Sequence, residues 1–208
     1  MRQADRETAM WDERYATDEY LFGTEPAAFL ATHAPSLPAA SRLLCVADGE
    51  GRNSVYLAEQ GHDVLAFDAS PVGLDKARGL AGARGVSVDY RLSGIEEWDW
   101  SQTHDALVAI FIQFMDPDLR AHIFNEFRRA VRPGGLLLLH GYAPRQVEYG
   151  TGGPPQADNM YTEELLQAHF GDWEILRLAD YDAEISEGRG HSGRSALVDL
   201  VARRPAES

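Results

Sequence analysis

Cysteine and positive charge are both scarce in this 208-residue sequence. The single cysteine, Cys45, lies in an apolar run, so the chain can form no internal disulfide and cannot build a zinc cluster from thiols. This usage suits a reducing compartment, and we expect a cytoplasmic protein. Lys and Arg number 19 against 33 Asp and Glu, which gives a formal net charge of −14. A surface this acidic repels phosphate backbones, so we expect no nucleic-acid partner.

Long apolar runs and metal-binding motifs are also missing. The longest apolar stretch, residues 106–114, is about half of a membrane span, and the charged start of the chain is unlike a signal peptide. We therefore expect no membrane contact. The histidines are scattered without ligand spacing, so no metal site is expected. What remains is an ordinary globular composition, with 44% apolar and 25% charged residues.

From residue 42 onward, short apolar runs alternate with segments of helical spacing, a pattern typical of a parallel sheet with crossover helices. Strands are predicted at 42–47, 63–68, 86–92, 106–112 and 136–139, followed by 173–185 and 195–203 joined by a hairpin-like turn. Helices are predicted at 54–60, from Pro71 to Gly82 or Gly85, at 117–132 and at 162–170. Pro133-Gly134-Gly135 should end the third of these helices, and residues 143–159 should form an irregular loop.

The first forty residues look different from the rest. We predict one helix around residues 11–15 and another at about 25–32, with a short linker into the first strand. The chain is therefore expected to hold one domain, residues 41–208, preceded by an N-terminal helical arm, residues 1–40. The aromatic residues of the arm could form a lid over a ligand or pack against the sheet, and these residues are Trp11, Tyr15, Tyr20 and Phe22.

The strongest functional signal is a glycine turn, residues 48–53 (DGEGRN), between the first strand and the first helix. Glycine lets the backbone turn sharply and approach a ligand where open α/β sheets bind ligands. Asp68 closes the second strand 19 residues after Gly49, a spacing at which a carboxylate can accept from both hydroxyls of a ribose. Together they predict an adenosyl ligand. The alternative is a structural turn in which Asp68 is only a turn carboxylate.

The details of the turn distinguish between adenosyl ligands. A dinucleotide site usually has a third glycine where this chain has Ser54, and Glu50 would bring negative charge toward the pyrophosphate. S-adenosylmethionine has no phosphate and carries a sulfonium and an ammonium, so it tolerates nearby carboxylates. The turn therefore favours S-adenosylmethionine over NAD.

From about residue 40 to its end, the chain resembles the class I S-adenosylmethionine-dependent methyltransferases. The motifs behind this resemblance are VADGEGRNS at 46–54, AFDAS at 66–70, HDALVAIF at 104–111 and RAVRPGGLLLLHG at 129–141. WDERY at 11–15 and YLFGTEP at 20–26 are more narrowly similar to small bacterial methyltransferases related to the tellurite-resistance and thiol methyltransferases. The chain departs from the usual acidic-x-Gly-x-Gly-x-Gly turn at Cys45 and Ala47, and Asp48 is a candidate substitute for the acidic residue.

The resemblance implies an α/β fold of the Rossmann-like, doubly wound type, with a seven-stranded, mostly parallel sheet, an antiparallel last strand and helices on both faces. It implies that Gly49 and Gly51 line the methionyl part of the cofactor and that Asp68 holds the ribose. Ile110 and Phe111 would face the sulfonium, although strand-end residues of this kind can also be core. The full predicted cofactor set is Asp48, Gly49, Gly51, Asn53, Asp68, Ala69, Leu92, Ser93, Ile110 and Phe111.

The implied activity is methyl transfer from S-adenosylmethionine to a small-molecule acceptor such as a thiol, a chalcogen species or a metalloid oxyanion. A non-catalytic cofactor-binding protein and an NAD(P)-dependent reductase are the alternatives. Three residues in segments that can reach the strand ends are the candidates for acceptor contact or catalysis: Tyr20, Tyr149 and His191.

His191 lies in a polar, glycine-rich turn, where it could accept a proton, contact the substrate or simply be solvated. His140, at a strand end, is expected to face the ligand crevice. The residues alone leave open whether the acceptor arrives as an anion or needs a base, and they give no oligomeric state.

Overall fold

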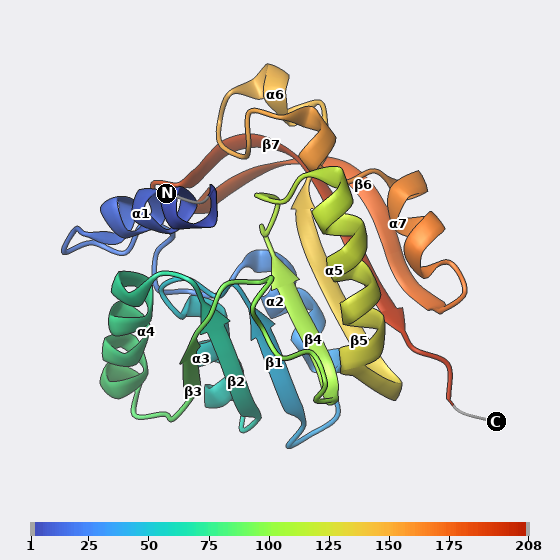
Figure 1. Ribbon diagram of the computed structural model, residues 1–208, viewed down its shortest axis with the longest axis horizontal. Helices are drawn as coiled ribbons and strands as arrows, with labels where there is room; N and C mark the ends of the chain where they lie inside the picture. The colour runs from blue at the N-terminus through green and yellow to red at the C-terminus, as the bar shows by residue number, and fades with distance from the viewer. Residues whose placement is uncertain (1–2, 207–208) are drawn as a thin grey trace.

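Seven strands form one sheet in the order β3-β2-β1-β4-β5-β7-β6, and helices cover both of its faces (Figure 1). The structure is a computed structural model that describes residues 3–206, with side chains from residue 8 onward, so residues 1–2 of the predicted arm and residues 207–208 of the predicted domain lie outside it. The first five strands of the chain, β1 to β5, run parallel to one another, and β7 runs antiparallel to its neighbours β5 and β6. This arrangement confirms the predicted fold class. The strands are β1 (Arg42–Val46), β2 (Asp63–Asp68), β3 (Asp89–Leu92), β4 (His104–Ile110), β5 (Val131–Tyr142), β6 (Glu174–Glu187) and β7 (His191–Arg203).

The helices fall into an N-terminal group and a group that connects the strands. The α-helices are α1 (Gln3–Tyr15), α2 (Ala28–His33), α3 (Arg52–Glu59), α4 (Pro71–Arg84), α5 (Pro117–Ala130), α6 (Gln146–Tyr149) and α7 (Glu163–Phe170), with 3-10 helices η1 (Ala34–Ser36) and η2 (Ala157–Asn159). Within residues 3–206, no helix combines the length and apolar character that crossing a bilayer requires.

The two faces of the sheet bury separate apolar clusters, because side chains alternate along each strand. Leu44 and Leu107 face a cluster that includes α5 and α7. Their neighbours Leu43 and Ala106 face a second cluster that includes α2 and α3. All four side chains are fully buried, so β1 and β4 are rigidly placed central strands whose ends can position a site.

Helix starts follow their sequence signals. The Ser70 hydroxyl accepts from the backbone N–H of Gly73 at the start of α4, and Pro71 occupies the first turn. Asp116 caps α5 in the same way. The predicted start of β3 at residue 86 is wrong: Val86 instead closes α4 after the left-handed Gly85, since its N–H donates to the Ala81 carbonyl.

The Pro133-Gly134-Gly135 run was predicted to separate α5 from the next strand, and this prediction is wrong. Helix α5 ends at Ala130 and β5 begins at Val131. The register between β4 and β5 shifts in this region, since Val131 pairs with His104 whereas Leu136 pairs with Ala106. The Pro-Gly-Gly run is therefore the extra length of an irregular strand start.

The segment after β5 is more ordered than predicted, because residues 143–159 contain α6 and η2. The fully buried Gln146 holds it together, with its side-chain amide bonded to Thr151, the Gly152 carbonyl and the Ala196 N–H. The final hairpin is also longer than predicted: β6 reaches Glu187 and β7 begins at His191, which leaves residues 188–190 as the turn.

The arm and the tip of this hairpin meet above the sheet. Helix α1 lies over the end of the sheet near β1 and β2, and the β6–β7 hairpin reaches the same place (Figure 1). The Gly190 N–H donates to the Leu21 carbonyl at 3.0 Å, and Arg189 pairs with Glu19 at 3.3 Å. Segments from the two ends of the chain therefore share one end of the molecule.

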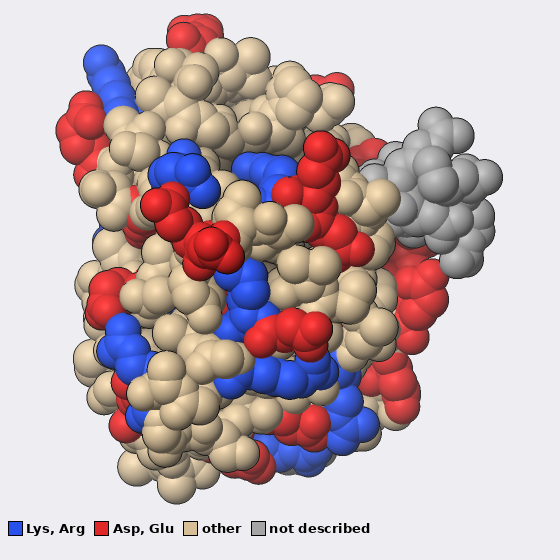
Figure 2. Space-filling view, turned by 90° about the vertical axis from the view of Figure 1, so that its left-hand side faces the viewer, with Lys and Arg blue, Asp and Glu red and all other residues tan. Residues whose placement is uncertain are grey.

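Charges of both signs are mixed on the side of the molecule that carries α1 and α4 (Figure 2). Ion pairs there include Arg78 with Asp75 at 2.9 Å and Arg84 with Glu25 at 2.6 Å. The basic side chains of this side are therefore interleaved with acidic ones instead of forming a continuous basic surface.

Candidate active site

A cavity of about 280 Å³ opens at the carboxyl ends of β1, β2 and β4, beneath the N-terminal arm. This is the switch point of the sheet, where β1 has β2 on one side and β4 on the other, and open α/β sheets bind ligands there. Its lining comes from the turn after β1, the end of β2, the segment after β3, the end of β4, the arm and the first residue of β7. The first turn of α5 adds Leu119, so the fold brings seven segments of the chain to one place.

The glycine turn is built on left-handed backbone. Gly49 and Gly51 have φ angles of +60° and +88°, and Ala47, at the family's first glycine position, has a φ of +48°. An L-residue with a Cβ is disfavoured there by about 1–2 kcal/mol, so the backbone retains a conformation that favours glycine. Gly49 lines the cavity, whereas Gly51 is outside its lining and packs against Ala77 and Tyr90.

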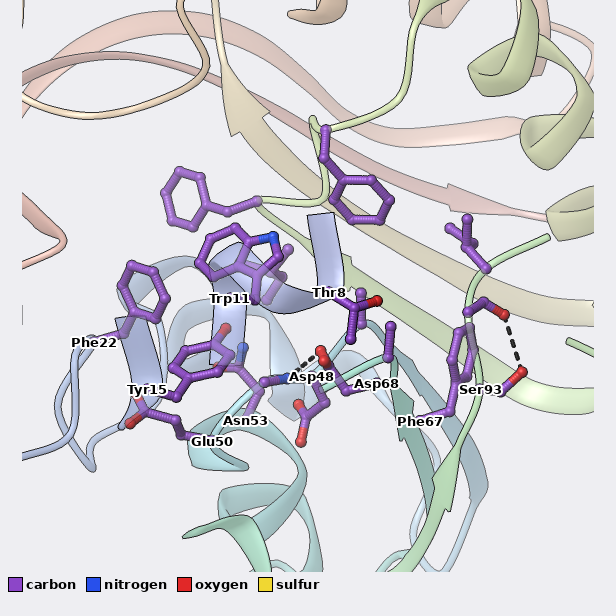
Figure 3. Close-up of a pocket in the computed structure, with 18 of the residues that line it drawn as sticks. Thr8, Trp11, Tyr15, Phe22, Asp48, Glu50, Asn53, Phe67, Asp68 and Ser93 are labelled. Atoms are coloured by element: carbon purple, nitrogen blue, oxygen red, sulfur yellow. Dashed lines mark hydrogen bonds between the residues drawn. The ribbon is translucent and has the colours of Figure 1, made fainter. Parts of the chain in front are cut away.

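Asp68 joins the turn to the end of β2. Its two carboxylate oxygens accept from the backbone N–H groups of Gly49 and Ser70, each at 2.8 Å, and its residue is 8% exposed, facing the cavity (Figure 3). Burial raises the pKa of Asp68, and the amide donors act against that rise. Each oxygen keeps a further lone pair, so Asp68 can fix the turn and still accept from a ligand.

Asp48 also lines the cavity, and its pKa is strongly raised. Its Oδ2 accepts from the Ser54 hydroxyl at 2.5 Å. Burial raises the pKa of Asp48 to about 7; the Ser54 hydrogen bond lowers it, and the nearby Asp68 charge raises it further. This carboxyl therefore changes charge near neutral pH.

The sequence suggested that Glu50 brings negative charge toward a ligand, but in the structure this charge is neutralised. Its carboxylate pairs with Lys76 Nζ at 2.5 Å and accepts from the Leu21 N–H at 2.8 Å. Lys76 neutralises the charge, and the bond to Leu21 ties the arm to the turn. The acidic character on the floor of the cavity comes instead from Asp48 and Asp68, and the exposed residues Glu96 and Glu97 add carboxylates to the lining.

Aromatic rings of the arm roof the cavity (Figure 3). The rings of Trp11 and Tyr15 stack with centroids 5.4 Å apart, and Phe22 lies 6.2 Å from Trp11. Asn53, at the floor, accepts from the Ala27 N–H at 3.0 Å and so holds the arm down. Whether this roof opens and closes as a lid stays a prediction.

The opposite wall comes from the end of β4 and the start of β7. Ile110, Phe111 and His191 all line the cavity. Phe111 has a φ of +57°, and its N–H donates to the His140 carbonyl at 2.8 Å. Its ring lies 4.1 Å from the His191 ring, centroid to centroid. Backbone strain at a bulky residue is often retained at functional sites.

His191 is buried, which excludes the solvated-loop interpretation. It is 7% exposed, with Phe22 packed 4.4 Å from its ring, and its Nδ1 has no hydrogen-bond partner in the part of the chain that the structure describes. Burial lowers the pKa of His191 to about 3, and the nearby charges of Arg52, His140 and Arg14 lower it further. The imidazole is therefore neutral at physiological pH. The polar turn sequence gave no sign of this burial, because the covering ring comes from the arm.

Two of the three predicted catalytic candidates lie outside the cavity lining. The Tyr20 hydroxyl donates to the Lys76 carbonyl at 3.1 Å, and the Tyr149 hydroxyl donates to Asp182 at 2.7 Å. His140 is also outside, because it pairs with Asp199 at 2.7 Å and stacks on Phe29. Local sequence could not show these partners, which come from distant strands and helices.

The three residues predicted to lie beside an adenine are all found at the cavity, and their contact with adenine stays a prediction. Ala69, Leu92 and Ser93 line the cavity, with Leu92 at its rim and 61% exposed. The sequence analysis did not predict the other lining residues, which are Thr8, Gly23, Arg52, Phe67, Gly94, Ile95, Glu96, Glu97, Phe114 and Leu119. Phe67 precedes Asp68 on the same strand, so its proximity to the site was the one available signal.

The buried neutral His191 should make stability depend on pH. Its folded pKa of about 3 lies below the unfolded value of about 6.5, so the unfolded chain binds the proton and this contribution to stability falls as pH drops through that window. Between pH 6 and pH 5 this effect should lower the free energy of unfolding of the unaltered protein by about 1 kcal/mol. The His191→Gln variant should not show this part of the decrease.

Urea unfolding of both proteins at the two pH values measures this difference. The matched control is His122→Gln, at an exposed position of α5, which should leave the pH dependence close to that of the unaltered chain. Equal pH dependence in the chain and in the His191→Gln variant would contradict the buried, neutral state of His191.

Together, the doubly wound sheet, the switch-point cavity and the paired acidic residues beside a glycine turn define a nucleoside-binding α/β protein. A family model described as "Methyltransferase domain" matches residues 43–135, which include β1 to β4 and the glycine turn. A curated relative, the ubiquinone biosynthesis O-methyltransferase of Rickettsia akari (strain Hartford), is 27% identical over 157 residues, covering 71% of this chain and 61% of that protein. The chain spans 52% and 61% of the length of the first curated relatives it matches.

Solved structures share the fold over nearly the whole chain. One of them is described as "Conversion of a Disulfide Bond into a Thioacetal Group during Echinomycin Biosynthesis". It has a TM-score of 0.78 at 17% identity, and the match covers 100% of this chain and 94% of that one. TehB from Haemophilus influenzae has a TM-score of 0.69 at 17% identity, covering 95% and 67%. The resemblance to the class I S-adenosylmethionine-dependent methyltransferases is confirmed.

Proposed function

We propose that this protein transfers a methyl group from S-adenosylmethionine to a small-molecule acceptor in the cavity beneath the arm. The observation that carries the proposal is the shared cavity: Asp48 and the buried Asp68 lie at its floor, and a neutral His191 lies within an aromatic wall. Carboxylates suit the hydroxyl and ammonium groups of the methyl donor, and apolar rings suit its sulfonium.

The residues fit the cofactor without a phosphate site. Asp68 would accept from the ribose hydroxyls and Asp48 would pair with the ammonium. Phe67, Leu92 and Ile95 would pack around the adenine near Ala69 and Ser93. When bound, S-adenosylmethionine supplies a methyl group already activated by its positive sulfur. The remaining task of the protein is to align the acceptor and exclude water.

The cavity favours acceptors that ionise without help. His191 is neutral, and a pKa of about 3 makes its imidazole too weak a base to deprotonate a phenol or an ammonium. Asp48 lies on the floor, where it accepts from the Ser54 hydroxyl and would pair with the ammonium of the cofactor instead of serving the acceptor. These features support an acceptor such as a thiol, a chalcogen species or a metalloid oxyanion. The fold neighbour linked to conversion of a disulfide into a thioacetal is consistent with sulfur chemistry.

Charge supports a small acceptor over nucleic acid. The formal net charge is −14, and basic groups on the side with α1 and α4 are interleaved with acidic ones (Figure 2). The one cysteine, Cys45, is buried as a free thiol, in keeping with a role in the reducing cytoplasm.

Transfer of label from S-adenosylmethionine carrying a radioactive methyl group tests the proposal. The acceptor panel comprises thiols, selenite, tellurite and phenols. We expect label in at least one small acceptor and none in added tRNA. Binding of S-adenosylhomocysteine without any turnover would indicate the non-catalytic alternative, and a fluorescence response to NADH or NADPH would indicate the reductase.

A further inference from the structure

We propose that the acceptor is an uncharged organic thiol with an apolar body, held by a hydrogen bond to His191 Nδ1 between the aromatic rings of the cavity. The inference rests on the proposed methyl transfer and narrows its substrate class. It excludes inorganic oxyanions, which the proposed function still allowed.

The polar anchor is His191. Its side chain is more than nine-tenths buried, it lines the cavity, and its Nδ1 has no partner within the described residues. A buried polar nitrogen without a partner costs about 1–3 kcal/mol, which a ligand group that pairs with it recovers. A neutral imidazole has one donor and one acceptor nitrogen, so Nδ1 can accept from an S–H or donate to a thiolate, depending on its tautomer.

The walls around this anchor are apolar. Phe22 and Phe111 pack against the His191 ring at 4.4 and 4.1 Å, and Trp11, Phe114 and Leu119 line the same cavity. Rings and aliphatic chains gain free energy by packing against such walls. A small oxyanion would instead leave several oxygens without donors there.

The charged groups of the cavity also disfavour an oxyanion. Arg52 is its one described guanidinium, and it is already paired: its NH2 lies 2.7 Å from Glu187, and its NH1 donates to the Phe22 carbonyl. Glu187 in turn accepts from the Ala28 N–H, which fixes this pair in place. Asp48 and Asp68 on the floor add negative charge, which repels a free anion and leaves a neutral thiol unaffected.

Sulfur is favoured over oxygen because the site holds no strong base near the wall. At pH 7.5 a thiol of ordinary acidity is roughly 10% ionised, whereas a phenol is about 0.3% ionised. The thiol would lose its proton to solvent, and its sulfur would then form the new bond to the methyl carbon. The bond from that carbon to the donor sulfur would break, giving a methyl thioether, S-adenosylhomocysteine and one released proton.

Acceptor binding to the protein saturated with S-adenosylhomocysteine tests this inference without turnover. Calorimetric titrations at pH 7.5 would compare phenylmethanethiol, which stays largely un-ionised, with phenol, mercaptosuccinate and tellurite. We expect phenylmethanethiol to bind at least about 30-fold more tightly than tellurite or mercaptosuccinate, since the latter two carry charge into an apolar wall. The labelled-methyl assay should then show turnover of phenylmethanethiol and at least about 30-fold less of phenol, because phenol is less ionised and its oxygen is a weaker nucleophile than a thiolate sulfur.

Variants of the anchor separate a direct contact from a structural role. His191→Leu should weaken phenylmethanethiol binding by about tenfold, the loss of one hydrogen bond, while S-adenosylhomocysteine affinity stays unchanged. His191→Asn, which keeps a neutral amide donor at similar reach, should recover most of the affinity. His122→Leu, at an exposed histidine on α5, is the control and should bind like the unaltered protein.

Three outcomes would overturn the inference while leaving the proposed function intact: tellurite binding as tightly as phenylmethanethiol, no thiol binding once S-adenosylhomocysteine is bound, or full phenylmethanethiol affinity in His191→Leu. The comparison of ligands on the unaltered protein decides the question even if the His191 variants fail to fold. Failure of S-adenosylhomocysteine itself to bind would instead overturn the proposed function.

Discussion

Asp68→Ala should lose most cofactor affinity and a large part of its stability together. The substitution leaves the N–H groups of Gly49 and Ser70 without their acceptor, and both are buried. Loss of two charge-assisted bonds should lower the free energy of unfolding by about 3 kcal/mol. The ribose contact and the shape of the turn would be lost at once, so S-adenosylhomocysteine should bind about 100-fold more weakly.

Thermal unfolding and calorimetric titration measure the two effects in the same preparations. Asp68→Asn is the informative companion, since its amide oxygen keeps one acceptor while its NH2 faces a second donor. It should fall between the unaltered protein and the alanine variant in both readouts. Normal cofactor affinity in Asp68→Ala would place the ribose away from this carboxylate.

Gly51→Ala should destabilise the protein by about 3 kcal/mol or more, although Gly51 does not line the cavity. A Cβ at this position would meet the Ala77 Cβ at 2.7 Å and the Ala77 Cα at 2.9 Å, and the φ of +88° disfavours any side chain. The clash is with helix α4 and its backbone, so a flexible side chain cannot relieve it. Helix α3 begins directly after Gly51, and its start would shift with the turn.

Gly82→Ala is the matched control. A Cβ there meets nothing within 4 Å, and the position lies inside α4. Alanine is the better helix former, so this variant should gain about 0.5–1 kcal/mol. Urea unfolding of the two variants distinguishes them by sign, and a Gly51→Ala protein as stable as the unaltered chain would contradict the close packing of the turn on α4.

The sequence predicted the fold well where local signals act alone. Ser70 and Asp116 cap their helices as their residue types predict, and the apolar run of β4 marks a strand buried on both faces. The errors lie where tertiary contacts outweigh local pattern. The Pro-Gly-Gly run at 133–135 looks like a break, yet pairing with β4 and with Arg204 draws it into β5.

The site was predictable along the strand ends and much less so across the cavity. Asp48, Gly49, Asp68 and the end of β4 follow directly from the glycine turn and from strand order, and all line the cavity. The environments of Glu50 and His191 were not predictable, because Lys76 and Phe22 reach them from other segments. A polar turn in sequence thus became a buried wall through contact with the arm.

The most direct test of the account is a calorimetric titration of the unaltered protein with S-adenosylhomocysteine, followed by NADH under the same conditions. The account predicts one-to-one binding of S-adenosylhomocysteine that Asp68→Ala weakens about 100-fold, and no response to NADH. Heat with NADH and none with millimolar S-adenosylhomocysteine would contradict it, because the acidic floor would then hold a ligand with phosphates.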